Sequence, residues 1–306
     1  MHVAVGIVGF RNRDDILACL EALGRSTYTD FEVVICENGG AASYAELAAE
    51  LPQKLAGGQS VRAVLAPGNL GYAGGVNVCI AESGDADMWW VLNPDTQPDP
   101  ECLQALVERL SGGDCDAVGG TLYHHGGTVQ AHGGRWRPWL ARAESLGHGG
   151  RLADGIDRGE IERRQSYIPG ASLLIGRRFH DVVGPMREEY FLYCEEVEWC
   201  LRALSLGLRL GFAPGARVLH GQGATTGSAD AITRRPRMPI YLDERNKLLV
   251  TRDCYPQRFP VAAAAALCLL ILRFGRRGAW RQLGYAFAGW RAGLRNERGI
   301  PSWLTT

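Results

Sequence analysis

The chain has 306 residues, of which 46% are hydrophobic and 22% charged, so it can bury a sizeable core as one large α/β domain with an appendage. Its 33 Lys and Arg residues balance 33 Asp and Glu residues, which excludes the global positive field that draws proteins to nucleic acid. The nine cysteines are scattered without a Cys-x-x-Cys pair, as is typical of reduced thiols in a cytosolic protein. No basic region and apolar run precede the first expected strand, so we expect no secretory signal.

The first half of the chain alternates expected strands and helices, as in a doubly wound sheet. Residues 3–10 form an apolar run typical of a parallel strand that is covered on both faces, and Asp14 or Asp15 is suited to cap the following helix. Further strands are expected at residues 31–36, 61–65, 88–92 and 117–123, and further helices at residues 45–55, 75–81 and 103–110. This order predicts an α/β fold with a mostly parallel central sheet flanked by helices.

Polar or glycine-rich strings follow three of these strands, at the sheet edge where open α/β folds bind ligands. They are ENGG at residues 37–40, NLGYAGGVN at residues 69–77 and NPD at residues 93–95. Glycines in the second string would let a base, a ribose or a diphosphate approach the backbone, and the alternative is a flexible turn. The turn after the first strand, GFRNRDD, lacks the spacing of a dinucleotide-binding dehydrogenase.

Residues 124–165 are rich in Gly, Arg and His and have no clear period, so we expect a long irregular loop. Trp136 and Trp139 offer stacking surfaces for a sugar. Four arginines offer positive charge to a diphosphate: Arg151, Arg158, Arg163 and Arg164. A solvated insertion without a role is the alternative for each of these side chains.

The segment FLYCEEVEWCLR at residues 191–202 places Glu195, Glu196 and Glu198 among aromatic and aliphatic side chains. Burial raises the pKa of a carboxyl group, which makes it a usable base near neutral pH. The alternative is a helix start, because Glu in a first turn complements the helix dipole and apolar residues recur here at helical spacing. Paired carboxylates also occur in glycoside hydrolases, but the polar and glycine-rich strings that follow the earlier strands argue against that class.

Six strings, taken in order, resemble the inverting glycosyltransferases of family 2, which have a GT-A fold, and especially their bacterial rhamnosyltransferase-like members. The strings are ICENGG, NLGYAGGVN, LNPDTQPD, PGASLLIGRR, FLYCEEVEWCLR and LHGQGATTG, and the resemblance covers residues 3–256. It implies a catalytic domain at residues 1–238. Within it, residues 1–123 would bind the nucleotide sugar, and residues 124–238, with the flexible loop 124–165, would form the acceptor side.

The resemblance also implies roles for single residues. Glu37 would hydrogen-bond a pyrimidine base, and Asp95, the acid of the DxD-type motif, would bind ribose and metal. Glu196 would deprotonate the acceptor hydroxyl, with Glu195 beside it, and His220 would complete a site for Mg²⁺ or Mn²⁺. The other implied donor-binding residues are Asn69, Gly71, Gly74, Gly75, Asn77 and Asn93. The implied acceptor-binding residues are Gly170, Ala171, Ser172, Glu198 and Trp199.

The chain departs from the family pattern at three of these positions. Glu37 stands where Asp is usual, Asn93 replaces the first acid of the DxD motif, and Glu196 stands where an Asp commonly acts as base. Asn93 removes one negative charge from the metal site. We therefore expect a weaker affinity for the metal, but we still expect the protein to use one.

Residues 239–306 are expected to form a C-terminal helical extension that begins in YLDERNKLLVTRDCYP, where Arg245 and Asn246 fit the family's Arg-Asn pair. The apolar run at residues 261–272 is shorter than the ~20 residues that span a bilayer. Arginines then alternate with aromatic and leucine residues: Arg273, Arg276, Arg277, Arg281, Arg291, Arg295 and Arg298. This pattern is typical of a protein that lies on an anionic membrane surface, and the alternative is a helical pair packed on the catalytic domain or on another subunit.

The sequence therefore predicts a metal-dependent, inverting transferase that moves L-rhamnose from dTDP-L-rhamnose to a saccharide or polyprenyl-linked saccharide in cell-surface polysaccharide synthesis. We expect a cytoplasmic protein, peripheral on the inner membrane, with no nucleic-acid partner. The sequence is compatible with a homo-oligomer and does not decide the oligomeric state. The alternatives are a transferase of the same fold that uses a UDP-sugar (galactofuranosyl, glucosyl or N-acetylglucosaminyl) and a non-catalytic sugar-binding or scaffold protein.

Overall fold

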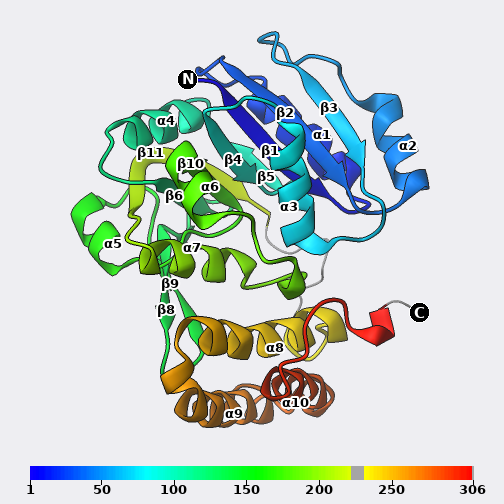
Figure 1. Ribbon diagram of the computed structural model, residues 1–306, viewed down its shortest axis with the longest axis vertical. Helices are drawn as coiled ribbons and strands as arrows, with labels where there is room; N and C mark the ends of the chain where they lie inside the picture. The colour runs from blue at the N-terminus through cyan, green and yellow to red at the C-terminus, as the bar shows by residue number, and fades with distance from the viewer. Residues whose placement is uncertain (222–230, 305–306) are drawn as a thin grey trace.

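The computed structural model describes residues 1–221 and 231–304. Within them, nine strands form one sheet in the order β3-β2-β1-β4-β10-β6-β11-β5, with β7 paired to β6 (Figure 1). The strands are β1 (Val3–Gly9), β2 (Phe31–Glu37), β3 (Val61–Leu65), β4 (Met88–Leu92), β5 (Thr96–Pro98), β6 (Ala117–Tyr123), β7 (Val129–Ala131), β10 (Ser172–Gly176) and β11 (Leu210–His220). Strands β1 to β4 pair in parallel, as do β6 and β11, whereas β10, β5 and β7 pair antiparallel. The prediction of a mostly parallel sheet is confirmed.

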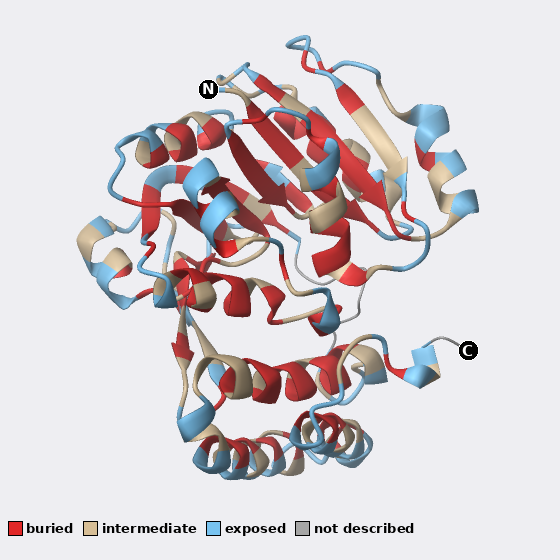
Figure 2. Cartoon of the chain, viewed as in Figure 1, coloured by how far each residue is buried: buried red, intermediate tan, exposed pale blue. Residues whose placement is uncertain are grey.

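Helices cover both faces of the sheet. The helices of this part are α1 (Arg13–Leu23), α2 (Ala41–Glu50), α3 (Gly71–Glu82), α4 (Cys102–Ser111), α5 (Arg158–Arg164), α6 (Arg177–Val183) and α7 (Glu195–Ser205), with a 3-10 turn, η1 (Glu188–Tyr190). In β1, Val5 and Ile7 face the side of α1 and α4, whereas Ala4 and Val8 face the side of α3, α6 and α7. This period of two explains why the strand is apolar on nearly every residue, and Figure 2 shows the central strands buried.

Two helices begin earlier than the sequence indicates. The helix expected at residues 45–55 is α2, which ends before Pro52, because the residue before a proline avoids the helical conformation. The helix expected at residues 75–81 is α3, which starts at Gly71, so the glycine-rich string forms its first turns rather than a loop before it.

The segment expected to be an irregular loop at residues 124–165 is largely ordered. It contains β7, α5 and a separate antiparallel hairpin of β8 (Gly133–Arg137) and β9 (Arg142–Leu146). Trp136 is buried in the hydrophobic core, so its ring cannot stack on a sugar. The missing sequence period has a physical cause: these strands have only three to five residues and do not alternate between buried and exposed positions.

Three helices follow the sheet and form the predicted C-terminal extension: α8 (Arg237–Cys254), α9 (Phe259–Gly275) and α10 (Trp280–Leu294). The helical stretch Pro256–Gly275 has 20 residues, and its most apolar 18-residue window has a mean hydropathy of 1.7 and is 28% buried. By length and composition alone it could cross a membrane. The expectation that the apolar run is too short to span is therefore wrong, because the helix continues past both ends of residues 261–272.

Candidate active site

The paired acids lie where helix α7 begins. Glu195 and Glu196 occupy its first turn, so the helix-start interpretation is correct and compatible with a catalytic one. Glu195 is buried, and its Oε2 has no hydrogen-bond partner among the described residues, whereas Glu196 is partly exposed. Burial raises the pKa of Glu196 to about 7. Burial, with the added charge of Glu196, raises the pKa of Glu195 well above its ordinary value. Near neutral pH, Glu196 can therefore accept a proton, and burial favours the protonated form of Glu195 beside it.

The backbone that leads into α7 is strained. Phe191, Tyr193 and Cys194 adopt positive φ angles of 67°, 74° and 68°, a region that side-chain-bearing residues rarely occupy. Each such residue costs on the order of 1 kcal/mol or more, so the surrounding structure must hold this turn in place. The turn sets the direction in which the two carboxylates point.

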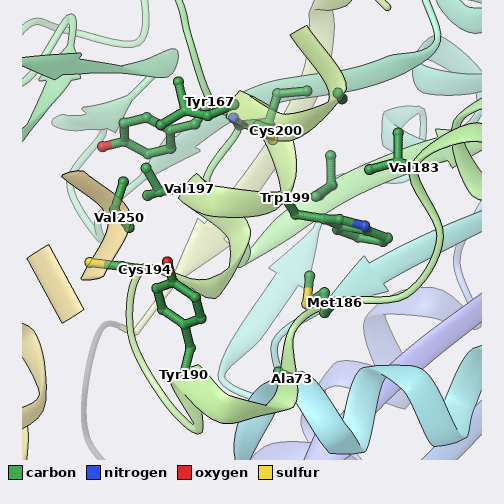
Figure 3. Packing of buried hydrophobic residues seen from close by; sticks show 14 of the residues in the cluster. Ala73, Tyr167, Val183, Met186, Tyr190, Cys194, Val197, Trp199, Cys200 and Val250 are labelled. Carbon is green, nitrogen blue, oxygen red and sulfur yellow. Dashed lines mark hydrogen bonds between the residues drawn. The ribbon is translucent and has the colours of Figure 1, made fainter. Parts of the chain in front are cut away.

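Asn246 and Arg245 of α8 hold this turn. Asn246 is fully buried, and its Nδ2 donates to the carbonyl oxygens of Tyr190 (2.9 Å), Leu192 (2.9 Å) and Tyr193 (2.7 Å). Arg245 Nη2 donates to Tyr190 O at 3.1 Å, and its Nε donates to Asn246 Oδ1 at 2.8 Å. Figure 3 shows the core beside the turn, where Tyr190, Cys194 and Val197 gather near Val250 of α8. The Arg-Asn pair is thus a structural clamp behind the acids.

Tyr72 links the acid pair to the nucleotide side. Its hydroxyl donates to Gly170 O at 2.7 Å, and a Cβ on Gly170 would lie 3.4 Å from Glu196 Cβ. Burial raises the pKa of Tyr72 well above its usual range, and the charges of Glu195, Glu196 and Asp95 raise it further. Tyr72 therefore lies within electrostatic reach of both the acids and Asp95. Sequence reasoning missed it, although it was the only aromatic residue in NLGYAGGVN.

The candidate metal ligands meet at the ends of two strands. Asp95 follows β4, and His220 ends β11 opposite Thr96 of β5. His220 Nε2 is buried, has no hydrogen-bond partner among the described residues and lies 3.4 Å from Asp95 Oδ1. His220 Nδ1 donates to Gln130 Oε1 at 2.7 Å. Because an amide oxygen only accepts, Nδ1 carries a proton, and in the neutral imidazole the Nε2 lone pair faces the carboxylate.

Two electron-pair donors that face each other fit a cation between them. Across residues 1–221 and 231–304, no group of three His, Cys, Asp or Glu side chains is arranged to hold a metal. Asp95 and His220 would therefore supply one oxygen and one nitrogen, and the remaining ligands would come from diphosphate and water, which suits Mg²⁺ or Mn²⁺. Gln130 is a further residue that the sequence analysis did not identify, and a lone buried glutamine carries no sequence signal for this role.

Glu37 ends β2 and is only 1% exposed. Its Oε1 accepts from the backbone N–H of Arg11 (3.2 Å), the backbone N–H of Gly39 (2.7 Å) and the Ser43 hydroxyl (3.2 Å). A Cβ at Gly9 would lie 2.6 Å from Glu37 Oε2, so the absence of a side chain there leaves room for the carboxylate. The carboxylate is held at the sheet edge, and its contact with a pyrimidine stays a prediction.

The glycines of the second string serve protein packing more than an open ligand cradle. Gly71 has a φ of 71°, and a Cβ there would collide with the carbonyl oxygen of Phe191. A Cβ on Gly75 would lie 2.5 Å from Val8 Cγ1, and Gly74 is equally crowded. These residues therefore bring α3 close to β1 and to the turn before the acids.

The asparagines differ in what they contact. Asn69 is exposed, and its Oδ1 accepts from the N–H of Gly71 at 3.0 Å. Asn77 Nδ2 donates to Met186 O and to Glu188 Oε1, both at 2.9 Å, which ties α3 to the segment before η1. Asn69 thus remains placed to meet a donor, whereas Asn77 is engaged by protein.

Two more asparagines connect the strand ends. Asn38, which the sequence analysis gave no role, donates from Nδ2 to Gly71 O at 2.8 Å. The backbone N–H of Asn93 donates to Ala171 O at 3.1 Å, so the NPD turn lies directly against the strand that follows Gly170. These two hydrogen bonds join segments that are far apart in the sequence at one edge of the sheet.

Three residues expected on the acceptor side lie in the core instead. Trp199 is fully buried, and its Nε1 donates to a backbone carbonyl at 2.8 Å. Glu198 accepts from Arg202 Nε at 3.0 Å, and Ser172 Oγ accepts from Trp90 Nε1 at 3.0 Å. These side chains are buried and bonded within the protein, whereas Glu196 is partly exposed, because neighbouring positions on a helix or strand point in different directions. Of the string LHGQGATTG, residues 222–227 lie outside the described residues.

Comparison with known proteins agrees with this arrangement. Residues 5–161, just over half of the chain, match the family model for glycosyl transferase family 2. The chain belongs to this family. It is 28% identical over 227 residues to an N-acetylglucosaminyl-diphospho-decaprenol L-rhamnosyltransferase of Mycobacterium tuberculosis, which covers 68% of this chain and 72% of the relative. It is 23% identical over 243 residues to the low-salt glycan biosynthesis hexosyltransferase Agl10 of Haloferax volcanii, which covers 76% of each chain.

Known structures show the same fold. The mannosyltransferase PcManGT of Pyrobaculum calidifontis, in complex with GDP-Man and Mn²⁺, has a TM-score of 0.58 at 13% identity over 97% of this chain and 88% of its own. S. aureus TarS 1-349 has a TM-score of 0.56 at 12% identity over 96% of this chain and 81% of its own. This family 2 glycosyltransferase therefore has the predicted GT-A fold, and structural neighbours bind Mn²⁺.

Proposed function

We propose that this glycosyltransferase inverts configuration as it moves L-rhamnose from dTDP-L-rhamnose to a polyprenyl-linked saccharide. The observation that carries the proposal is geometric: His220 Nε2 lies 3.4 Å from Asp95 Oδ1, and the hydroxyl of Tyr72, in the glycine-rich string, donates to Gly170 O beside Glu196. In an inverting transfer, the diphosphate leaves from one side of the anomeric carbon and the acceptor hydroxyl attacks from the other. This arrangement offers a group for each, Asp95 with His220 for the diphosphate and Glu196 for the hydroxyl. The rhamnose and lipid assignments are supported by the name of the M. tuberculosis relative.

Proton transfer belongs to Glu196. Its pKa of about 7 allows a carboxylate that accepts the proton of the acceptor hydroxyl as the oxygen attacks the anomeric carbon. Asp95 and His220 would hold the divalent cation, which when bound supplies positive charge beside the departing diphosphate. No residue forms a bond to the sugar in this scheme, so the configuration inverts.

A donor screen tests this proposal. Thermal shift with Mn²⁺ and dTDP-L-rhamnose, UDP-glucose, UDP-galactofuranose, UDP-N-acetylglucosamine or GDP-mannose measures binding to the folded state. We expect dTDP-L-rhamnose to stabilise most and GDP-mannose least, because Glu37 would accept from the pyrimidine imide N–H that uracil and thymine share. Preference for a UDP-sugar would overturn the rhamnose assignment. Failure to hydrolyse or transfer any donor would favour a non-catalytic protein.

We also propose that the enzyme works at the cytoplasmic face of the inner membrane. A polyprenyl-linked acceptor is anchored in the bilayer, and nucleotide sugars are cytoplasmic metabolites. Cell fractionation tests this, and recovery of all the protein in the soluble fraction at low salt would contradict it.

A further inference from the structure

The two last helices expose an apolar stripe on the side that faces away from α8. On α9 the exposed positions recur at helical spacing, and the opposite positions, such as Ala263 and Leu270, are buried. On α10 the same holds, and Trp280 is 69% exposed. Figure 2 shows the outer sides of both helices as exposed. The large exposed apolar residues are Val261, Ile271, Leu272, Trp280, Phe287 and Leu294.

The hairpin of β8 and β9 adds to this stripe from a distant part of the sequence. In Figure 1 it extends from the catalytic domain to the beginning of α9. Its tip carries Trp139, which is 53% exposed, and Leu140, which is also exposed. The guanidinium of Arg258 lies 5.0 Å from the Trp139 ring centre, so the tip touches the segment that opens α9. We call these eight residues, with the arginines named next, the basic apolar face.

The charge of this region is one-sided. The 51 residues from Pro256 to the C-terminus carry eight arginines and one acid, Glu297, in a chain whose totals are balanced. Arg273 and Arg298 pair with acids of α8 and η1. Arg295 pairs with Glu297. The other five form no ion pair with any described residue: Arg258, Arg276, Arg277, Arg281 and Arg291. Unpaired positive charge beside exposed tryptophan and leucine is complementary to an anionic lipid surface.

We infer that the basic apolar face docks on the surface of an anionic bilayer, with the hairpin tip as a second contact beside α9 and α10. This inference rests on the proposed function, because a lipid-linked acceptor would place the substrate of the enzyme in such a membrane. A second copy of the chain fits less well, because two strongly positive faces would repel each other.

Docking on the surface also fits better than spanning. One side of α9 is packed on the protein: Trp290 Nε1 of α10 donates to Ala263 O at 2.9 Å, and the Arg252 guanidinium of α8 lies 3.9 Å from the Phe259 ring centre. To cross a bilayer, α9 would have to leave α8, whose residues Arg245 and Asn246 hold the catalytic turn. A helix that stays in this layer meets lipid with its outer side only.

Vesicle co-sedimentation with the full-length protein tests the inference. We expect binding to vesicles of phosphatidylglycerol and phosphatidylcholine in equal parts, no binding to pure phosphatidylcholine, and release at about 1 M salt, where screening acts within about 3 Å. Arg276→Glu with Arg277→Glu should weaken binding at least about 25-fold. Trp139→Ala should weaken it roughly 5- to 10-fold. The matched controls are Arg163→Glu of α5 and Val182→Ala of α6, both at exposed positions elsewhere, and they should bind as the parent does.

Unchanged melting temperatures confirm that each variant folds. The inference is overturned if the parent binds neither vesicle, if Trp139→Ala binds like Val182→Ala, or if alkaline carbonate fails to release the protein, since that marks insertion. A dimer that dissociates on Trp280→Ala, without vesicle affinity, overturns it as well. Binding is measured without a donor, so loss of transfer with intact vesicle binding contradicts only the proposed function. Intact transfer to a soluble acceptor without vesicle binding contradicts only this inference.

Discussion

At the scale of single residues, the burial that makes Glu196 a base also defines a test. If its carboxylate deprotonates the acceptor, Glu196→Gln should lower the rate of transfer roughly 10²- to 10⁴-fold while donor binding survives. In the parent, kcat/KM should fall tenfold per pH unit below about pH 7, because protonation removes the base. Initial rates with a soluble acceptor analogue from pH 5 to 9 measure both.

Glu195→Gln is the natural control for this assignment. Glu195 is buried, and burial raises its pKa and favours its protonated form, so its replacement should alter the rate far less than that of Glu196. An inactive Glu195→Gln beside a normal Glu196→Gln would reverse the two roles.

The same carboxyl should make the protein less stable in alkali. Because the folded pKa of Glu196 is raised, from 4.5 to about 7, its stabilising contribution is complete below pH 4.5 and is lost as the pH rises through 7. Glu196→Gln avoids that loss. At pH 8 its free energy of unfolding should therefore be roughly 2 to 3 kcal/mol higher than that of the parent, and at pH 4.5 it should show no gain. Urea denaturation at the two pH values measures this difference. An equal gain at both would contradict the linkage.

Gln130 offers a test of the metal site that needs no turnover. Its Oε1 holds the His220 ring so that Nε2 faces Asp95, and removal of such a partner typically weakens metal binding 10- to 100-fold. Gln130→Leu should therefore bind Mn²⁺ more weakly in calorimetry with dTDP present. Gln59→Leu, at another buried glutamine, should not. Equal Mn²⁺ affinity in both variants would exclude this role for Gln130.

At the scale of elements, α8 positions the acids of α7. The turn before α7 has three left-handed residues, and Asn246 donates to three of its carbonyl oxygens. Asn246→Ala would remove the side-chain donor of the Leu192 and Tyr193 carbonyls, whereas Tyr190 O keeps Arg245. The cost is about 1 to 3 kcal/mol for each unsatisfied group that the loop cannot relax. We expect a lower melting temperature and a fall in kcat larger than the rise in KM. The exposed Gln257→Ala is the control, and an Asn246→Ala enzyme with parental kcat would show that the turn holds itself.

The elements also show what sequence could predict. The β1, β2, β4 and β6 positions were predictable because each strand is apolar on both faces, and the loops between them are short. The β8–β9 hairpin was not, because its strands are short and its tip meets a distant part of the chain, as in the contact of Trp139 with Arg258 before α9.

The site was predictable only in part. Glu195, Glu196, Asp95 and His220 lie in strings with an order that sequence can show, and the structure brings Asp95 and His220 together. Roles that depend on which way a side chain points were not predictable. Trp199 is next to Glu198 and close to the acids in sequence, yet it turns into the core.

At the scale of the whole molecule, the end of the described chain completes the catalytic domain. Gly299 N–H donates to Glu189 O at 2.6 Å, and Gly299 O accepts from Arg245 Nη1 at 2.6 Å. Arg298 pairs with Asp253 at 2.6 Å and with Glu189 at 2.9 Å. The segment after α10 therefore returns to the turn that α8 clamps, so the predicted packing of the extension on the catalytic domain and its membrane role are compatible.

Arg298 and Arg295 separate these two contributions, because both are arginines at the end of α10 with different surroundings. Arg298→Ala removes one of two arginine partners of the poorly exposed Asp253, which keeps Arg187 and the Tyr190 hydroxyl. The loss of the charged hydrogen bonds of Arg298 should lower the free energy of unfolding by about 2 kcal/mol and slow transfer even to a soluble acceptor. Arg295 pairs only with the exposed Glu297, at 3.8 Å, so Arg295→Ala should change stability by less than about 1 kcal/mol. Urea denaturation and soluble-acceptor assays of both variants measure the difference. Equal stability of the two would mean that the C-terminal segment contributes nothing to holding the catalytic turn.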